Sequence, residues 1–203
     1  MDIQIKRLKK KDLNKVIDFA VEGMHFDRYV DSKIALSLYG RYFLYLELKR
    51  ANHIIAAYMG DRLVGILMAD MNNRPMFNSS FWRNLYIKIA DIILKTGFKS
   101  GTNRYDEANA IMLKSFKKNA EPDGEICFLA ADPTIHGKGI GTKLLEELKK
   151  REKGKLIYLF TDDNCTYQFY EHKGFERSEE QKILMDIHGK QIPLTCLLYS
   201  LTL

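Results

Sequence analysis

Hydrophobic and polar positions change their spacing several times along the chain, and each change predicts a new element. Residues 3–5 alternate between apolar and polar, which is typical of a short strand. Apolar residues then recur at helical spacing over residues 10–23, where a glycine marks the helix end, and again over residues 32–50. Two apolar runs around a Gly-Asp pair predict a β-hairpin over residues 53–70.

Residues 71–123 follow a different pattern, in which a loop rich in Asn, Pro and Ser precedes two helical segments. One helical face is marked by Phe81, Leu85, Ile89, Ile92 and Ile93, and the other by Tyr105, Ala108, Met112 and Phe116. About 50 residues with one apolar face per helix make a marginal core on their own. We therefore predict a two-helix insertion packed on the main body of a single domain, residues 1–203.

The last part of the chain, residues 124–203, predicts alternating strands and helices. "EICFLAAD" is a nearly continuous apolar run, as expected of a strand covered on both faces. A glycine-rich segment and an amphipathic helix follow, and the helix turns Ile140, Leu144, Leu145 and Leu148 inward. "KLIYLFTDD" predicts another buried strand, "NCTYQFYEHKGF" a short helix and "IPLTCLLYSL" a closing strand. The fold class is α/β (mixed α+β), with a central mixed sheet of about six to seven strands flanked by helices.

Composition and charge exclude several classes of function. The chain has 46% hydrophobic and 29% charged residues, which is ordinary for a globular protein. The formal net charge of +6 lies upstream of residue 124, and the basic cluster "KRLKKKD" is interpreted as a solvated strand end and turn. A nucleic-acid partner would need a longer basic face interleaved with aromatics, so none is expected.

The location expected from the sequence is the cytoplasm. Cys127, Cys165 and Cys196 are odd in number and widely spaced, so they form neither a zinc pattern nor a disulfide framework. No apolar run approaches the ~18 residues that span a bilayer, and the first residues lack the apolar core of a signal peptide. We therefore expect a cytoplasmic protein with no membrane partner.

The segment "IHGKGIGTKLLEELKK", residues 135–150, carries the main chemical signal. Glycines at the start of a helix favour a phosphate held by backbone N–H groups. A Walker A loop needs Lys-Ser or Lys-Thr after its last glycine, whereas this chain has Thr142-Lys143. A dinucleotide fingerprint lacks its third glycine, which would fall at Thr142. The pattern Q/R-x-x-G-x-G/A fits in all but the first letter, His136, and a glycine-rich turn without a ligand is the alternative.

Two stretches together resemble the GNAT superfamily of acyl-CoA-dependent N-acyltransferases. They are "FLAADPTIHGKGIGTKLLEEL" and "LFTDDNCTYQFYEHKGFERS", and the resemblance runs from Glu125 to around Ser178. It implies a GNAT-like sheet that splays into a V between the strands at residues 125–131 and 155–161, with coenzyme A in the V. The insertion departs from the family's minimal plan, so acceptor specificity is not transferred.

The resemblance also implies which residues bind the cofactor. The pantetheine arm is expected along the backbone of Leu129, Ala130 and Ala131, and Asn164, or Asp163 in its place, is expected to bond that arm. The pyrophosphate is expected at His136, Gly137, Lys138, Gly139, Ile140, Gly141 and Thr142. His136 replaces the family's Gln or Arg, which suggests weaker or pH-dependent cofactor binding. No metal is expected.

Transfer of an acyl group to an amine needs a proton for the departing thiolate. The resemblance assigns this role to Tyr170, because a phenol stays protonated at neutral pH. The base is less defined: Glu125 could act through water, and Asp162 is either a base or a turn former. Neither Cys127 nor Cys165 has a histidine nearby in sequence, so we expect direct transfer rather than a covalent enzyme intermediate.

The predicted function is acetyl-CoA-dependent N-acetylation of a primary amine in a small molecule. The acceptor site is expected near the loop with Met24, His25, Phe26 and Tyr29, roofed by the inserted helices with Phe77, Trp82 and Tyr86. Packing alone is the other interpretation of these residues. A non-catalytic acyl-CoA-binding module with a partner-binding insertion is the alternative function. The closing strand either forms a homodimer interface or completes the sheet.

Overall fold

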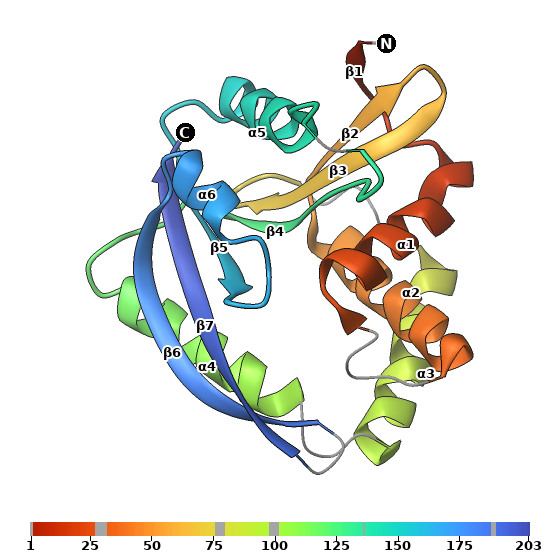
Figure 1. Ribbon diagram of the computed structural model, residues 1–203, viewed down its shortest axis with the longest axis vertical. Coiled ribbons are helices and arrows are strands. Elements are labelled where there is room, and N and C mark those ends of the chain that lie inside the picture. The colour runs from red at the N-terminus through yellow and green to blue at the C-terminus, as the bar shows by residue number, and fades with distance from the viewer. Residues whose placement is uncertain (1, 27–31, 76–79, 98–101, 136, 188–189) are drawn as a thin grey trace. The chain divides into compact units, whose positions relative to one another are not determined.

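The computed structural model describes residues 2–26, 32–75, 80–97, 102–135, 137–187 and 190–203, and these form a mixed α/β fold (Figure 1). The elements in chain order are β1 (Ile3–Lys6), η1 (Lys10–Asp12), α1 (Leu13–Gly23), α2 (Lys33–Arg50), β2 (His53–Met59), β3 (Arg62–Met71), α3 (Phe81–Gly97), α4 (Thr102–Phe116), β4 (Gly124–Ala131), α5 (Ile140–Arg151), β5 (Leu156–Asp162), α6 (Gln168–His172), β6 (Glu176–Ile187) and β7 (Lys190–Thr202). Within the described residues the sheet has seven strands in the order β1-β2-β3-β4-β5-β7-β6. The β4–β5 pair is parallel and the pairs β1–β2, β2–β3, β5–β7 and β6–β7 are antiparallel, so the predicted mixed sheet is confirmed.

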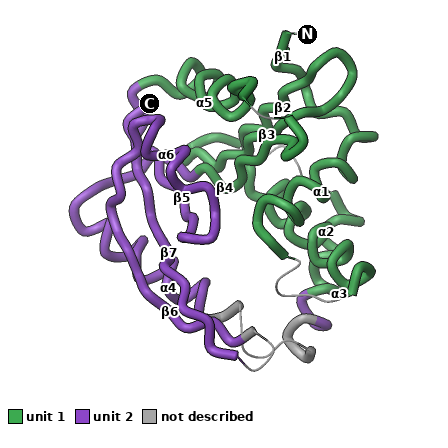
Figure 2. The backbone as a smooth tube through the Cα atoms, viewed as in Figure 1, with its two compact units in different colours: residues 1–90, 126–153 green, residues 91–125, 154–203 purple. Residues whose placement is uncertain are grey.

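The chain divides into two compact units (Figure 2). Unit 1 consists of residues 1–90 and 126–153, and unit 2 consists of residues 91–125 and 154–203. Strand β4 therefore contributes its first two residues to unit 2 and the others to unit 1. The assignment of the whole chain to one domain stays a prediction.

Unit 1 has a sheet covered on both faces by helices. Helices α1 and α2 pack on one face through a core that includes Phe19, Leu44 and Ile66. Helix α5 packs on the same strands through the four leucine and isoleucine residues expected from its periodicity, Ile140, Leu144, Leu145 and Leu148, all of which are buried. Burial on both faces explains why β3 is apolar at consecutive positions rather than at every second one.

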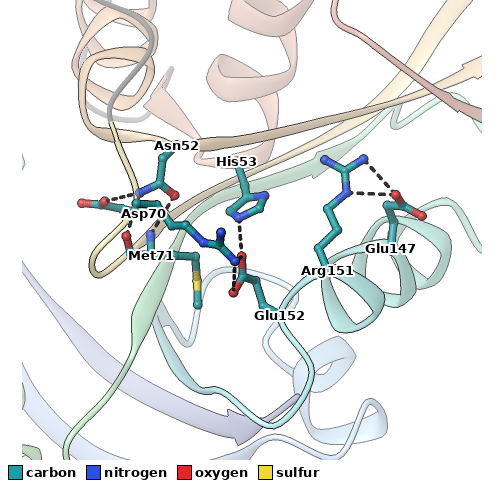
Figure 3. Close-up of polar contacts among 8 residues, drawn as sticks. Asn52, His53, Asp70, Met71, Glu147, Arg151 and Glu152 are labelled. Carbon is teal, nitrogen blue, oxygen red and sulfur yellow. Dashed lines mark hydrogen bonds and ion pairs between the residues drawn. The ribbon is translucent and has the colours of Figure 1, made fainter.

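Polar contacts fix the end of α5 to the hairpin of β2 and β3 (Figure 3). Glu152, which ends α5 and is buried, lies 2.7 Å from the Nε2 atom of His53 and 3.1 Å from Arg74. Asn52 exchanges hydrogen bonds with the backbone of Met71, at 2.7 and 2.9 Å, and so ties the start of β2 to the end of β3. The contacts of Glu152 with His53 and Arg74 hold the carboxyl end of α5 in place.

Unit 2 is built around β7, which pairs with β5 on one edge and β6 on the other. The closing strand therefore completes the sheet. Helix α4 packs on β6 and β7 with Ala108, Met112 and Phe116 buried, as its sequence predicted. Strand β6 was not predicted, because its first half is rich in charged residues and only its ladder with β7 defines it.

Helix α3 forms as predicted, but its apolar face does not pack inward. Phe81, Trp82, Leu85, Ile89, Ile92 and Ile93 are all exposed. The helix is anchored instead by buried Ile87 and by Tyr86, whose hydroxyl donates to the backbone oxygen of Leu38 at 2.9 Å and whose ring contacts Tyr45. A periodic pattern shows which residues share a face, but the packing of the whole chain decides which face is covered.

Strand β4 also differs in detail from the prediction of burial on both faces. Its residues alternate between buried and half-buried, with Ile126, Phe128 and Ala130 buried and Cys127 and Leu129 half-buried. One face of this strand therefore belongs to the core, and the other face is partly open.

Candidate active site

The glycine-rich segment forms the turn that starts α5. Gly139 is the N-cap residue with φ +65°, and Gly137 has φ +68°. L-residues with a side chain rarely adopt this left-handed conformation, so the backbone itself requires glycine at both positions. A Cβ atom built at either glycine would meet no atom within 4 Å. The space beside the loop is therefore open, and the first N–H groups of α5 have no acceptor inside the helix. His136 lies outside the described residues.

The turn between β4 and this loop is held by Asp132, a buried residue that sequence reasoning did not single out. Its Oδ1 atom accepts hydrogen bonds from the backbone N–H and the hydroxyl of Thr134, at 3.0 and 2.6 Å. Its Oδ2 atom accepts from Arg62 at 2.7 Å. Burial by itself raises the pKa of Asp132, but the hydrogen bonds from Thr134 and Arg62, with Lys15 nearby, lower it to about 2. The only signal in the sequence was the Asp-Pro-Thr order, which favours a turn closed by the aspartate side chain.

Gly65 of β3 lets α5 approach the sheet closely. A Cβ atom at this position would lie 2.5 Å from Cγ2 of Ile140, 3.1 Å from Cδ1 of Leu144 and 3.2 Å from the backbone oxygen of Ala130. The missing side chain therefore sets the height of the first turn of α5 above β3 and β4. Nothing local in the sequence distinguishes this glycine from others in strands, so it was not predicted as part of the site.

The strand segment expected to bind the pantetheine arm lies at the end of β4. Leu129 is half-buried, Ala130 is buried and Ala131 is exposed. The parallel ladder to β5 comprises the pairs Gly124–Ile157 and Glu125–Tyr158. The ladder thus ends at Glu125, ahead of the three residues that the sequence singled out.

In unit 2, Tyr170 lies on the short helix α6, where aromatic rings surround it. Its ring makes an edge-to-face contact with Phe175 at 5.6 Å and a tilted contact with Tyr199 at 6.2 Å between centroids. The side chain is half-buried, and its hydroxyl makes no hydrogen bond to another described residue. Burial raises the pKa of Tyr170 above that of an ordinary tyrosine, and Cys165 raises it further. The phenol therefore keeps its proton at neutral pH.

Asn164 lies in the loop after β5, and its position is fixed by Asp162. The backbone N–H of Asn164 donates to Oδ1 of Asp162 at 2.9 Å, and the hydroxyl of Tyr105 donates to Oδ2 at 3.3 Å. Asp163 bonds to β7, where its carboxylate accepts from the backbone N–H of Thr195 at 3.1 Å. The side chain of Asn164 is exposed and, within the described residues, has no partner. Asp162 thus forms the turn after β5, and the carboxylate of Asp163 is engaged with β7.

The two cysteines of unit 2 are neutral thiols. Burial, with a contribution from Asp162, raises the pKa of both Cys165 and Cys196 to about 12. A thiol becomes a good nucleophile only as the thiolate, so neither side chain is activated for covalent catalysis.

Glu125 is half-buried and takes part in a hydrogen bond. The hydroxyl of Tyr158 donates to its Oε2 atom at 3.2 Å, and the ring of Tyr158 lies against Phe116 of α4. Among the described residues no cluster of three or more His, Cys, Asp or Glu side chains could hold a metal ion.

The predicted residues are divided between the two units, and in unit 2 Glu125 pairs with Tyr158 of β5 whereas Asn164 and Tyr170 follow the end of that strand. Unit 1 contains Leu129, Ala130, Ala131, Gly137, Lys138, Gly139, Ile140, Gly141 and Thr142, and unit 2 contains Glu125, Asn164 and Tyr170. Of the residues expected around the acceptor, Phe26 is buried against Tyr39 and Phe43, Trp82 is exposed and Tyr86 bonds to α2. Tyr29 and Phe77 lie outside the described residues.

Two comparisons with known proteins agree with the resemblance seen in the sequence. A family model described as an acetyltransferase (GNAT) domain matches residues 101–177, which include α4, β4, the glycine loop, α5, β5 and α6. No curated protein matches the chain. None of the helices in the described ranges is long and apolar enough to cross a membrane.

Several solved structures share the fold over the whole chain. One is PH1933 from Pyrococcus horikoshii OT3, with 19% identity, a TM-score of 0.58 and coverage of 100% of both chains. Another is the PaiA N-acetyltransferase from Thermoplasma acidophilum in complex with coenzyme A, with 16% identity, a TM-score of 0.54 and the same coverage. Arabidopsis thaliana NAA60 in complex with a bisubstrate analogue is 14% identical over 98% of this chain and 97% of its own, with a TM-score of 0.53.

The structure therefore has the fold of the GNAT acetyltransferases. Residues 101–177 carry the family's domain signature, and the resemblance inferred from the sequence is confirmed.

Proposed function

We propose that the protein is an acetyl-CoA-dependent N-acetyltransferase that transfers an acetyl group to a primary amine of a small molecule. The observation that carries this proposal is the left-handed glycine turn at the start of α5, with open space where side chains would project. Such a turn suits a pyrophosphate, because N–H groups and the helix dipole stabilise an anion without a metal.

The residues present fit coenzyme A. The amides of Gly137 to Thr142 would hold the pyrophosphate, with Lys138 as an exposed cation beside it. His136 would replace the usual Gln or Arg of the family's pattern. The backbone of Leu129, Ala130 and Ala131 would pair with the amide-containing arm, since the ladder to β5 ends at Glu125. Asn164 has an exposed amide for the same arm.

The chemistry follows from the protonation states of the chain's own groups. Acetyl-CoA supplies an activated thioester, and the amine nitrogen forms the new bond to its carbonyl carbon as the bond to sulfur breaks. Tyr170 holds a proton on its hydroxyl for the departing sulfur. Glu125, acting through water, is the proposed acceptor of the amine's proton. The neutral thiols of Cys165 and Cys196 support direct transfer.

The first experiment is calorimetric titration with acetyl-CoA, carried out on the unaltered protein and on the Gly139→Glu variant. The matched control is Gly154→Glu, because Gly154 also has a positive φ (+79°) and open space around its Cβ position. Both variants gain the same charge, at a position where the backbone is left-handed. We expect affinity to fall at least about tenfold in Gly139→Glu and to stay unchanged in Gly154→Glu. An equal loss of affinity in the two variants, or no binding of acetyl-CoA by the unaltered protein, would refute the proposed pyrophosphate site at the glycine loop.

A non-catalytic acyl-CoA-binding module is the alternative, favoured by one observation. Residues 156–161 of β5 contain no Asp or Glu that could serve as a base. Release of free thiol from acetyl-CoA in the presence of a panel of primary amines separates the two functions. An enzyme produces thiol in proportion to amine, whereas a binding module produces none although it binds acetyl-CoA.

The proposed location is the cytoplasm. Cys127, Cys165 and Cys196 are thiols rather than disulfides, which is the state that a reducing compartment maintains.

A further inference from the structure

Helix α3 presents its apolar face to solvent. Phe81 and Trp82 are 73% and 75% exposed, and Leu85 and Ile89 are 38% and 51% exposed. On an ideal helix these four side chains fall within an arc of about 100°. Ile92 and Ile93, also exposed, continue the same face. Single exposed apolar residues are common, but a contiguous set of this size marks a surface that contacts something.

Two exposed residues of α2 extend this surface. Ile34 and Leu38 lie one helical turn apart, and both are more than half exposed. The hydroxyl of Tyr86 on α3 donates to the backbone oxygen of Leu38, so the two helices meet at this point. We call Ile34, Leu38, Phe81, Trp82, Leu85 and Ile89 the α2–α3 patch. All six residues belong to unit 1.

The charges within the two segments that carry the patch are basic. Residues 32–43 and 80–90 contain Lys33, Arg41, Arg83 and Lys88 but no Asp or Glu, and Asp31 and Asp91 lie directly beside these ranges, so the segments keep an excess of positive charge. Lys33 and Lys88 are exposed. The patch is thus apolar with a basic border, in a chain whose formal net charge is +6.

The apolar surface and its basic border together decide between two possible binding partners of the α2–α3 patch. A second copy of the chain would bring one basic border against another, and like charges at a contact are unfavourable. An anionic lipid surface neutralises the border, and its boundary between headgroups and acyl chains accepts apolar side chains, with Trp favoured at that depth. A helix that lies in the plane of the surface needs no membrane-spanning length.

We propose that the α2–α3 patch docks the protein onto the surface of an anionic lipid membrane, with α3 lying in the plane of the interface. This inference goes beyond the proposed acetyl transfer and does not depend on it. It replaces the expectation from the sequence that the protein has no membrane partner.

The chain provides its own probe, because Trp82 is its single tryptophan. The full-length protein is titrated with vesicles of phosphatidylcholine containing roughly one third phosphatidylglycerol, and separately with pure phosphatidylcholine. We expect the Trp82 emission to shift to the blue and the protein to sediment with the anionic vesicles. Raising the salt from about 0.1 M to about 0.5 M should weaken this binding, because salt screens the basic border.

Matched substitutions test the residues involved. Leu85→Asp and Ile89→Asp should each weaken vesicle binding at least about tenfold, since a charge replaces a side chain that enters the apolar layer. Ile111→Asp on α4 makes the same change at a residue that is 56% exposed but outside the patch, and should bind normally. Lys88→Ala should weaken binding to anionic vesicles, and Lys114→Ala, at an exposed lysine of α4, should not.

Three outcomes would overturn the proposal. One is an emission spectrum of Trp82 that no vesicle changes. Another is a blue shift that grows with protein concentration in the absence of lipid, together with a dimer in analytical ultracentrifugation, which would assign the patch to a second copy. The third is equal loss of binding in Ile89→Asp and Ile111→Asp. Thermal unfolding of each variant shows whether the fold is retained.

Discussion

The Nε2 atom of His53 lies 2.7 Å from Oε1 of Glu152, so the first residue of β2 contacts the residue that ends α5, ninety-nine positions later in the chain (Figure 3). Glu152 is buried and also pairs with Arg74. This carboxylate therefore couples the end of the helix that begins with the glycine loop to the β2–β3 hairpin.

Removal of Glu152 should be costly. Glu152→Ala leaves His53 and Arg74 without their shared carboxylate, and breaking a partly buried pair of this kind costs about 3 kcal/mol in unfolding free energy. Glu147→Ala is the control, because its partner Arg151 lies on the same helix and the pair is more exposed. We expect that variant to lose less than about 0.5 kcal/mol in urea unfolding. Equal losses would show that the Glu152 contacts do not stabilise the fold.

Stability should depend on the charge of Asp132 at low pH. The folded-state pKa of about 2 is below the ordinary value of 3.8, so ionised Asp132 stabilises the folded state. This contribution, about 2 kcal/mol, is fully present above about pH 4 and is lost as the pH falls towards 2. Urea unfolding at several pH values should therefore show a steeper acid loss in the unaltered protein than in Asp132→Asn. A constant difference between the two proteins from neutral pH to about pH 3 would contradict the prediction.

A side chain at Gly65 should displace the start of α5. Gly65→Ala places Cβ 2.5 Å from Cγ2 of Ile140, and overpacking of this kind costs about 2 kcal/mol. We also expect weaker binding of acetyl-CoA, because the glycine loop moves with the helix. Gly23→Ala is the control, since nothing lies within 4 Å of its Cβ position. Unaltered stability and affinity in Gly65→Ala would mean that the close approach has no role.

The hydroxyl of Tyr170 should affect the rate rather than the binding. Tyr170→Phe keeps the ring contacts with Phe175 and Tyr199 but removes the hydroxyl that we propose as the proton donor. We expect kcat to fall about a hundredfold with little change in the KM for acetyl-CoA. Both constants are measured from the release of free thiol. Because the pKa of Tyr170 is raised, its ionisation should cause no loss of rate up to about pH 9. Tyr167→Phe, one turn away, should behave as the unaltered protein. A normal kcat in Tyr170→Phe would exclude this role.

Cys165 should be dispensable for catalysis. Its thiol has a pKa of about 12 and is therefore not a nucleophile at neutral pH. Cys165→Ser should retain kcat within a factor of about three, and mass spectrometry of the protein mixed with acetyl-CoA should detect no acetylated enzyme. Loss of activity together with a transferable acetyl group on the unaltered protein would instead establish a covalent intermediate.

Local sequence patterns predicted much of the fold because they depend on near neighbours. The hairpin turn at Gly60, the helix over residues 32–50 and the inward face of α5 all follow from spacing and residue type. The strand β6 was missed because its charged first half lacks alternation. Only the ladder with β7 shows it to be a strand.

The glycine turn was predictable because it is a continuous motif whose backbone requires glycine. The role of Tyr170, which comes from another short segment, stays a prediction. Asp132 and Gly65 were missed, because their roles come from contacts with residues far away in the sequence, such as Arg62 with Asp132 and Ile140 with Gly65.

The sequence by itself determined the order of the elements other than β6, the glycine loop that starts α5 and the residues that share each helical face, since all three depend on backbone conformation and local spacing. Tertiary structure alone decided which of those faces are buried. The apolar faces of α3 and α5 have the same kind of periodicity, yet α5 is buried against the sheet and α3 is exposed with Trp82 at its start. Burial is a property of the neighbours that the whole chain brings to a helix, and periodicity contains no information about those neighbours.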